Sequence, residues 1–116
     1  MKIDALQDFA RRDQDRRRQL ALRGLDDAIG AIDLEIKTAL SFRANRLRRE
    51  RAKLSRLLKS ARPELFRDFA DEVANLLEID PDKVSVPQWR RFGQDYIAGL
   101  TPYAAAQVAR VAGGAS

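Results

Sequence analysis

The sequence contains no cysteine and no histidine. Without cysteine the chain has no disulfide, no thiolate metal site and no cysteine nucleophile, and without histidine it lacks the commonest general base and metal ligand. A hydrolytic site would then need paired carboxylates, or a lysine beside a serine. The acidic residues are instead dispersed at spacings typical of exposed helix faces. We therefore expect a protein that is not an enzyme and uses no metal or cofactor.

Long apolar runs are missing as well. No segment approaches the ~18 apolar residues needed to span a membrane, and the first residues lack the apolar core of a secretory signal. We therefore expect a cytoplasmic protein without a membrane partner. An apolar content of 45% in 116 residues suits one small helical domain over residues 1–116. Such a domain has enough apolar residues to form a core, but few more than it needs.

The longest regular pattern lies between residues 25 and 61, where no proline occurs. Apolar residues recur there at steps of three and four, which places them on one side of a helix. They are Leu25, Ile29, Ile32, Ile36, Leu40, Ala44, Leu47, Leu54, Leu58 and Ala61. The pattern predicts an all-α fold around one long central helix over about 25–61, a rod of roughly 55 Å.

A first helix is expected from residue 3 toward Gly24. Residues 11–18 contain nothing apolar, so this part can stand in solvent but cannot belong to a core. At Gly24 the helix either folds back on the central helix or continues into it. A single glycine costs only ~1 kcal/mol inside a helix, so continuity or a shallow bend is favoured.

Three shorter helices are expected within residues 63–112, packed on the long one. Pro63 can open the first of them, which runs to about Leu77, because proline suits the first helical position. A turn follows at residues 80–82, and Ser85 precedes the second helix. Thr101 followed by Pro102 is the clearest helix start in the chain.

Two stretches resemble parts of known families. Residues 73–84, with Phe92-Gly93-Gln94-Asp95, resemble the first helix and loop of an acyl carrier protein, but Tyr96 stands where that family has the serine that carries pantetheine. No prosthetic group can then be attached. Residues 100–113 resemble the first helix and turn of a helix-turn-helix. Because no recognition helix follows, we expect no sequence-specific reading of the major groove.

Charge is unevenly distributed along the chain, whose net charge is +5. The net balance is −3 over residues 25–42, +8 over residues 43–62 and −5 over residues 63–85. Arginines outnumber lysines 17 to 5. The planar arginine fork matches phosphates and carboxylates, although a GC-rich genome would give the same excess.

The +8 segment carries the best functional clue. Four of its cations share an arc of about 80° on the helix face opposite Leu47, and we call them the basic ridge: Arg46, Arg49, Lys53 and Arg56. Their ~15 Å span is about the length over which a single strand presents two or three phosphates. Arg43, Arg48 and Arg51 would widen the contact, and Arg90 and Arg91 are further candidates at the edge of the aromatic helix. Alternatively, the ridge is a solvated face, or the chain's own acidic segments neutralise it, either within the fold or between copies in a head-to-tail assembly.

Other residues suggest packing rather than chemistry. Trp89 and Phe92 could form a stacking platform for bases, but aromatic residues at helical spacing more often belong to a core. Leu34 and Phe42 lie on a second apolar strip that the C-terminal helices or another chain should cover.

The leading interpretation is a small basic helical subunit that contacts the phosphate backbone of DNA or RNA within a larger nucleoprotein assembly. The alternative is a protein–protein adaptor, regulator or phage structural component whose basic helix face docks an acidic protein surface. Either interpretation allows a homo-oligomer.

Overall fold

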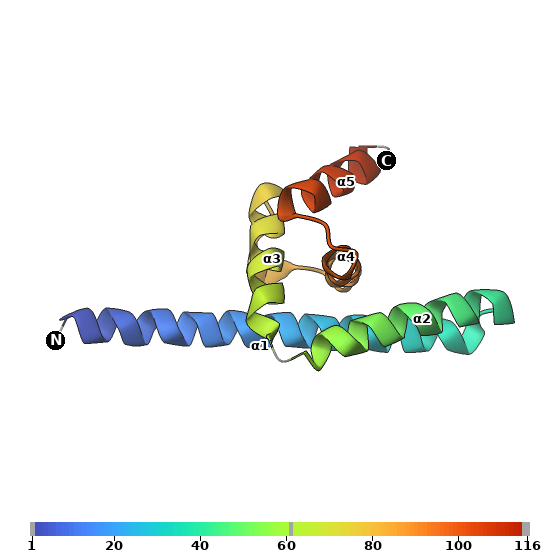
Figure 1. Cartoon of the computed structure of the whole chain (residues 1–116), viewed down its shortest axis with the longest axis horizontal. Coiled ribbons are helices and arrows are strands. Elements are labelled where there is room, and N and C mark those ends of the chain that lie inside the picture. Colours follow the sequence, from blue (N-terminus) through green and yellow to red (C-terminus); the bar gives the residue numbers. More distant parts are fainter. Residues whose placement is uncertain (1, 61, 115–116) are drawn as a thin grey trace.

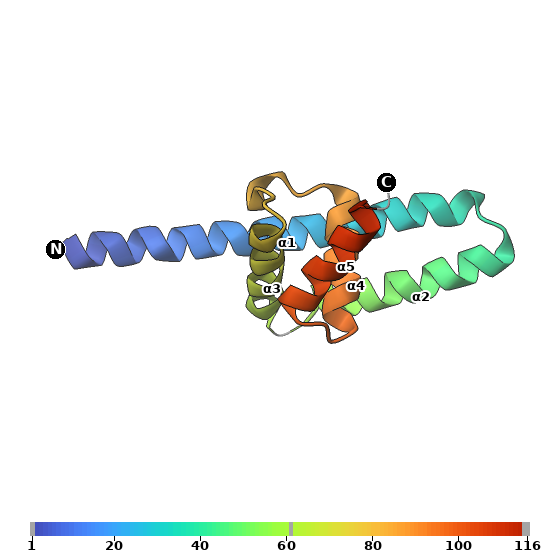
Figure 2. The ribbon, with the colours of Figure 1, turned by 90° about the horizontal axis from the view of Figure 1, so that it is seen from above.

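The computed structural model describes residues 2–60 and 62–114, and these form helices without any strand. The predicted all-α fold with three shorter C-terminal helices is confirmed. In chain order the elements are α1 (Lys2–Thr38), α2 (Ser41–Leu58), α3 (Pro63–Leu76), the 3-10 turn η1 (Pro81–Lys83), α4 (Val86–Ile97) and α5 (Pro102–Gly114). Figures 1 and 2 show α1 along most of the 60 Å length of the molecule, α2 beside its C-terminal half, and α3 to α5 stacked over its middle.

The predicted single helix over 25–61 is wrong. The first helix ends at Thr38, the chain turns through Ala39 and Leu40, and α2 returns along α1 as an αα-hairpin (Figure 1). Leu40 has an extended backbone, with φ −66° and ψ 154°. The last residue of the expected helix, Ala61, lies outside the described residues.

Burial explains why the helix breaks. As one rod, the apolar stripe would run for roughly 55 Å and three short helices would have to cover it. In the hairpin the two halves of the stripe cover each other, so Ile32, Leu47 and Leu54 are all buried. The gain from burying these side chains, about 1.5–3 kcal/mol each, outweighs the local preference for an uninterrupted helix.

Gly24 does not interrupt α1, as the sequence favoured. It is buried where α1 meets α4, and a Cβ on it would lie closer than 3.0 Å to three ring atoms of Trp89. The glycine therefore permits a close approach between the two helices, and no turn depends on it. Gly93 plays the same part on α4, where a Cβ would crowd Leu54 of α2.

The aromatic residues of α3 and α4 form the centre of the core, which confirms the preference for packing over a stacking platform for Trp89 and Phe92. Trp89 is 5% exposed and contacts Phe66 and Phe92, with ring centroids 6.2 and 5.9 Å apart. Tyr96 meets Phe66 edge-on at 5.5 Å. Neither Trp89 nor Phe92 is available to stack on a base.

The short helices begin where the sequence places their caps. Pro63 is the first residue of α3. Ser85 and Gln88 form a capping box at the start of α4, and the Thr101 hydroxyl accepts a hydrogen bond from the Ala104 amide at 3.1 Å. These local signals set where α3, α4 and α5 begin, and the three helices together form a cap over the middle of α1.

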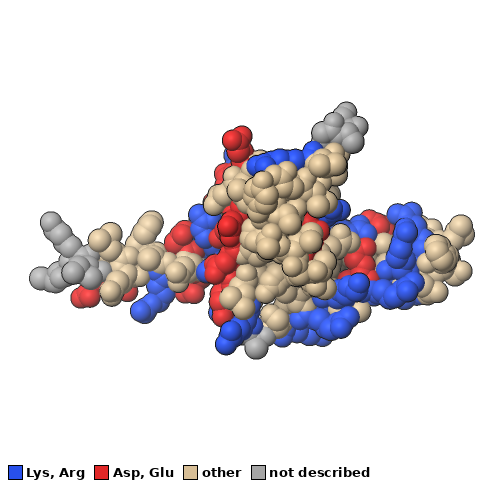
Figure 3. All heavy atoms as spheres, turned by 45° about the horizontal axis from the view of Figure 1, so that its top comes forward, with Lys and Arg blue, Asp and Glu red and all other residues tan. Residues whose placement is uncertain are grey.

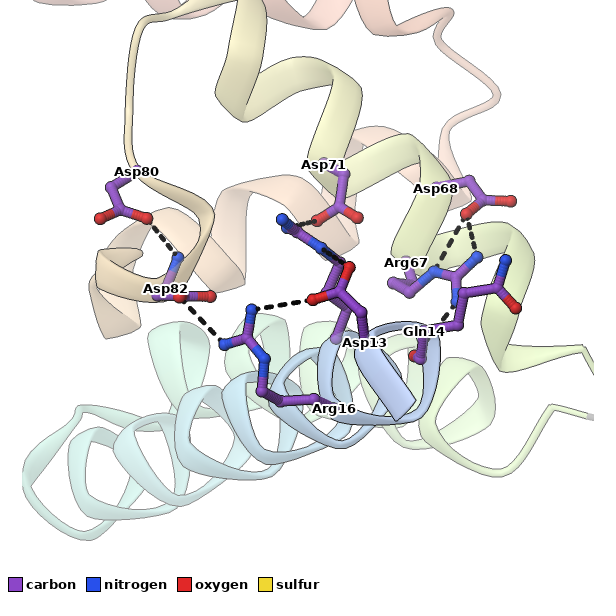
Figure 4. Close-up of polar contacts among 9 residues, drawn as sticks. Asp13, Gln14, Arg16, Arg67, Asp68, Asp71, Asp80 and Asp82 are labelled. Carbon is purple, nitrogen blue, oxygen red and sulfur yellow. Dashed lines mark hydrogen bonds and ion pairs between the residues drawn. The ribbon is translucent and has the colours of Figure 1, made fainter. Parts of the chain in front are cut away.

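Ion pairs attach this cap to α1 (Figure 4). Arg16 of α1 pairs with Asp82 of η1 at 2.9 Å, and Arg17 with Asp71 of α3 at 3.7 Å. Asp13 accepts hydrogen bonds from both arginines, chiefly Arg17, which lower its pKa. The acidic segment 63–85 is thus partly neutralised by residues 11–18 of α1, the stretch without apolar side chains.

Candidate nucleic-acid interface

The basic ridge lies on the outer face of α2. All four of its side chains are exposed, whereas Leu47 and Leu54 on the opposite side are buried against the core. The turn at Ala39 and Leu40 shortens the helix without disturbing this face, because Ser41–Leu58 contains the whole ridge. Figure 3 shows Lys and Arg side chains gathered along the α2 side of the molecule.

The ridge cations have no ion pair with any residue that the structure describes, whereas the cations that support the fold do. On the hairpin, Arg51 pairs with Asp33 at 2.6 Å and Arg43 with Glu35 at 3.6 Å. The acids of 63–85 that form ion pairs contact arginines of α1 and α3. The acidic segments therefore neutralise other arginines and leave the basic ridge uncompensated.

Arg90 is placed differently from the ridge. Its side chain is only 23% exposed, and it donates hydrogen bonds to both carboxylate oxygens of Glu50 and, at 2.8 Å, to Glu35. The bonds to Glu50 are the main reason why its pKa lies above the ordinary arginine value. With its donors engaged in joining α4 to both arms of the hairpin, Arg90 has a structural role and we leave it out of the interface.

Arg91 also has a partner within its own helix. Its Nε donates to Asp95 at 3.2 Å, one turn along α4. Asp95 is buried, so this pair partly compensates a carboxylate inside the fold. Arg91 does not lie with the ridge along the groove described next.

A groove of about 750 Å³ runs between α1, α2 and α4 beside the ridge. Arg43 and three ridge residues line one side, and Ile97 at the end of α4 and the following Ala98 line another. The Arg90–Glu50 pair also borders it. The pattern of the sequence did not indicate this groove, because it forms only when the hairpin closes and α4 crosses it.

Leu34 and Phe42 are 65% and 79% exposed, so the C-terminal helices do not cover them. Of the two coverings expected from the sequence, the one by the C-terminal helices is therefore wrong, and the one by another chain stays a prediction. Leu40, counted in the sequence as part of the buried stripe, is also exposed. The hairpin tip, formed by Ala39, Leu40 and the first turn of α2, therefore presents apolar side chains.

Within residues 2–60 and 62–114, no helix has the length and apolar character that crossing a bilayer requires. Comparison with protein-family models, with curated proteins and with solved structures finds no match to this chain.

Proposed function

We propose that this chain is a non-enzymatic helical protein whose basic ridge on α2 contacts the phosphate backbone of nucleic acid without reading sequence. One observation carries the proposal. Acids such as Asp33, Glu50 and Asp82 pair with arginines of other elements, while the four ridge cations are exposed and have no ion pair with a described residue. Such uncompensated cations in a row release condensed counterions when they meet phosphates.

The geometry favours backbone contact over base recognition. The ridge rises by ten residue steps along α2 from Arg46 to Arg56, ~15 Å, about the length over which a single strand presents two or three phosphates. Arginine and lysine bound to phosphates position a protein on nucleic acid but carry no sequence information.

Titration of a fluorescent oligonucleotide against salt tests the proposal. Contacts with the two or three phosphates that this span presents predict a slope of log affinity against log salt of roughly −2 for a single strand. The double variant Arg49→Glu/Lys53→Glu should weaken binding and flatten the slope. Its melting temperature should stay near the parent's, since both side chains are exposed and neither has an ion pair with a described residue.

A matched control separates the ridge from net charge. Arg11→Glu/Arg12→Glu changes the total charge by the same amount, on an exposed part of α1 at the opposite end of the molecule (Figure 2). This control should bind much more tightly than the ridge variant. Equal losses in the two variants, or no binding by the parent at about 20 mM salt where screening is weakest, would exclude the ridge as a site.

A second candidate function, a protein adaptor or assembly component, is favoured by a different observation. Residues 4–12 of α1 are exposed throughout, and this segment, the N-terminal arm, extends beyond the other helices with Leu6 and Phe9 on its surface (Figure 1). A helix of about this length is marginal on its own in water. Light scattering of the parent and of Leu6→Ser/Phe9→Ser tests whether the arm mediates association, which the adaptor function predicts.

A further inference from the structure

The exposed aromatic residue at the hairpin tip lies in line with the basic ridge. Phe42 precedes Arg46, Arg49, Lys53 and Arg56 by 4, 7, 11 and 14 residues. At about 100° per residue, all four cations lie within roughly 40° of the Phe42 direction on the helix. The ring therefore begins the row that the cations continue, over ~21 Å of helix.

The turn at Ala39 and Leu40 creates this placement. Had the helix continued through residue 40, Phe42 would lie midway along a rod, flanked by further turns on both sides. In the structure it belongs to the first turn of α2 and is 79% exposed at the far end of the molecule from the N-terminal arm (Figures 1 and 2).

We propose that the ligand of this surface is single-stranded nucleic acid, with Phe42 stacking on a base while the basic ridge follows the adjoining phosphates. The proposal rests on the proposed function of the ridge and names the class of its ligand. Sites for single strands combine a positively charged track with aromatic side chains, since every base has a π-face and the backbone carries the charge.

Two features favour this ligand over a duplex or a protein. The bases of a duplex are already stacked, so an exposed ring on a backbone-contacting helix would add nothing there. A protein partner would match the exposed apolar side chains of Leu40 and Phe42 at the tip, yet the side chains that follow Phe42 on its own helix face are the cations Arg46 and Arg49, both exposed. Charge and aromatic surface in one row match a polyanion whose bases are unpaired.

The experiment compares Phe42→Leu with Phe42→Trp. Leucine keeps an apolar side chain and removes the π-face, whereas tryptophan enlarges it. The probes are fluorescent oligo(dT) and oligo(U) of about 12 nucleotides, within the range of single-strand site sizes, and a duplex of equal length. Using both oligo(dT) and oligo(U) distinguishes DNA from RNA as the source of the strand.

Phe42→Leu should weaken binding to the single strands roughly tenfold, as expected for the loss of one stacked base, and should leave duplex binding almost unchanged. Its salt slope should stay near that of the parent, because counterion release depends on the cations. Phe42→Trp should restore the affinity, and its fluorescence should be quenched on binding. The native Trp89 is buried and adds a constant background.

The outcomes separate this proposal from the function on which it rests. If the parent binds with the expected slope and Phe42→Leu binds single strands equally well, stacking is excluded and the ridge proposal stands. If Phe42→Leu instead weakens self-association and leaves binding unchanged, Phe42 belongs to a protein interface. Absence of binding by the parent overturns both proposals. Because the side chain is exposed, all variants should melt with the parent, which is checked first.

Discussion

Substitution of Gly24 by alanine tests the central packing of the fold. The new Cβ would lie closer than 3.0 Å to Cγ, Cδ2 and Cε2 of Trp89, a distance at which atoms must move. The indole has little freedom to do so, since it is 5% exposed and packed against Phe66 and Phe92. The strain should therefore push α4 away from α1.

Two opposed effects determine the magnitude. Alanine is a better helix former than glycine by about 1 kcal/mol, whereas overpacking a core costs about 1–3 kcal/mol and occasionally more. Because the indole ring cannot turn away, the cost of overpacking should lie at the upper end of this range. We therefore expect Gly24→Ala to lower the free energy of unfolding by about 2 kcal/mol. Gly30 is the matched control, because it is exposed in the same helix and a Cβ there meets nothing within 4 Å.

Gly30→Ala should gain the ~1 kcal/mol of better helix propensity without strain. The free energies of unfolding of the two variants should therefore differ by about 3 kcal/mol. Urea denaturation followed by circular dichroism and by Trp89 fluorescence measures the difference directly. In the background Trp89→Leu the penalty at Gly24 should shrink, as a double-mutant cycle would reveal. Equal stability of the two alanine variants would mean that α1 and α4 do not approach at Trp89, and the reasoning would fail.

The remaining predictions concern the charged contacts. Arg90→Leu should lower the free energy of unfolding by about 1–3 kcal/mol by leaving Glu50 without its partner, and replacing both residues by leucine should recover part of this loss. The salt slope of nucleic-acid binding should not change, and a flatter slope would return Arg90 to the interface. Asp13→Asn should be less stable than the parent at pH 7. Hydrogen bonds from Arg17 and Arg16 hold the Asp13 pKa below its ordinary 3.8, so the stability it contributes is present above that value and is lost as pH falls through the folded-state pKa. The melting temperatures of the parent and of Asp13→Asn should therefore approach each other as the pH is lowered from 7 to below 3.8. A difference that stays constant over this range would contradict the hydrogen bonds from Arg17 and Arg16 to Asp13.

The sequence predicted best what short-range chemistry determines. The starts of α3, α4 and α5 depend on Pro63, Ser85 and the Thr101-Pro102 pair, whose caps act within a few residues. The spacing of the ridge cations needs only the helical period. Both sets were predictable because they require no knowledge of the partner helices.

The turn at Ala39 and Leu40 was not predictable by the same means. No glycine or proline marks it, and no side chain caps the start of α2. A three- and four-residue apolar period fits one long helix and a hairpin equally well, and only the burial of the two halves against each other favours the hairpin. The ion pairs of Arg16 with η1 and of Arg17 with α3 were not predictable either, because they join residues more than 50 positions apart.

The distribution of ion pairs separates the fold from the proposed site. Arg16, Arg51 and Arg90 hold elements together through acids of other segments, so replacing them should lower stability. The ridge cations have no such partner among the described residues, so reversing their charge should change binding without changing stability. An effect of the total charge alone cannot produce that separation. It requires two sets of cations, one in ion pairs between elements and one without such partners. Parallel melting and salt-titration measurements on Arg90→Leu and on Arg49→Glu/Lys53→Glu should therefore show opposite effects, because each variant alters only one of the two sets of contacts.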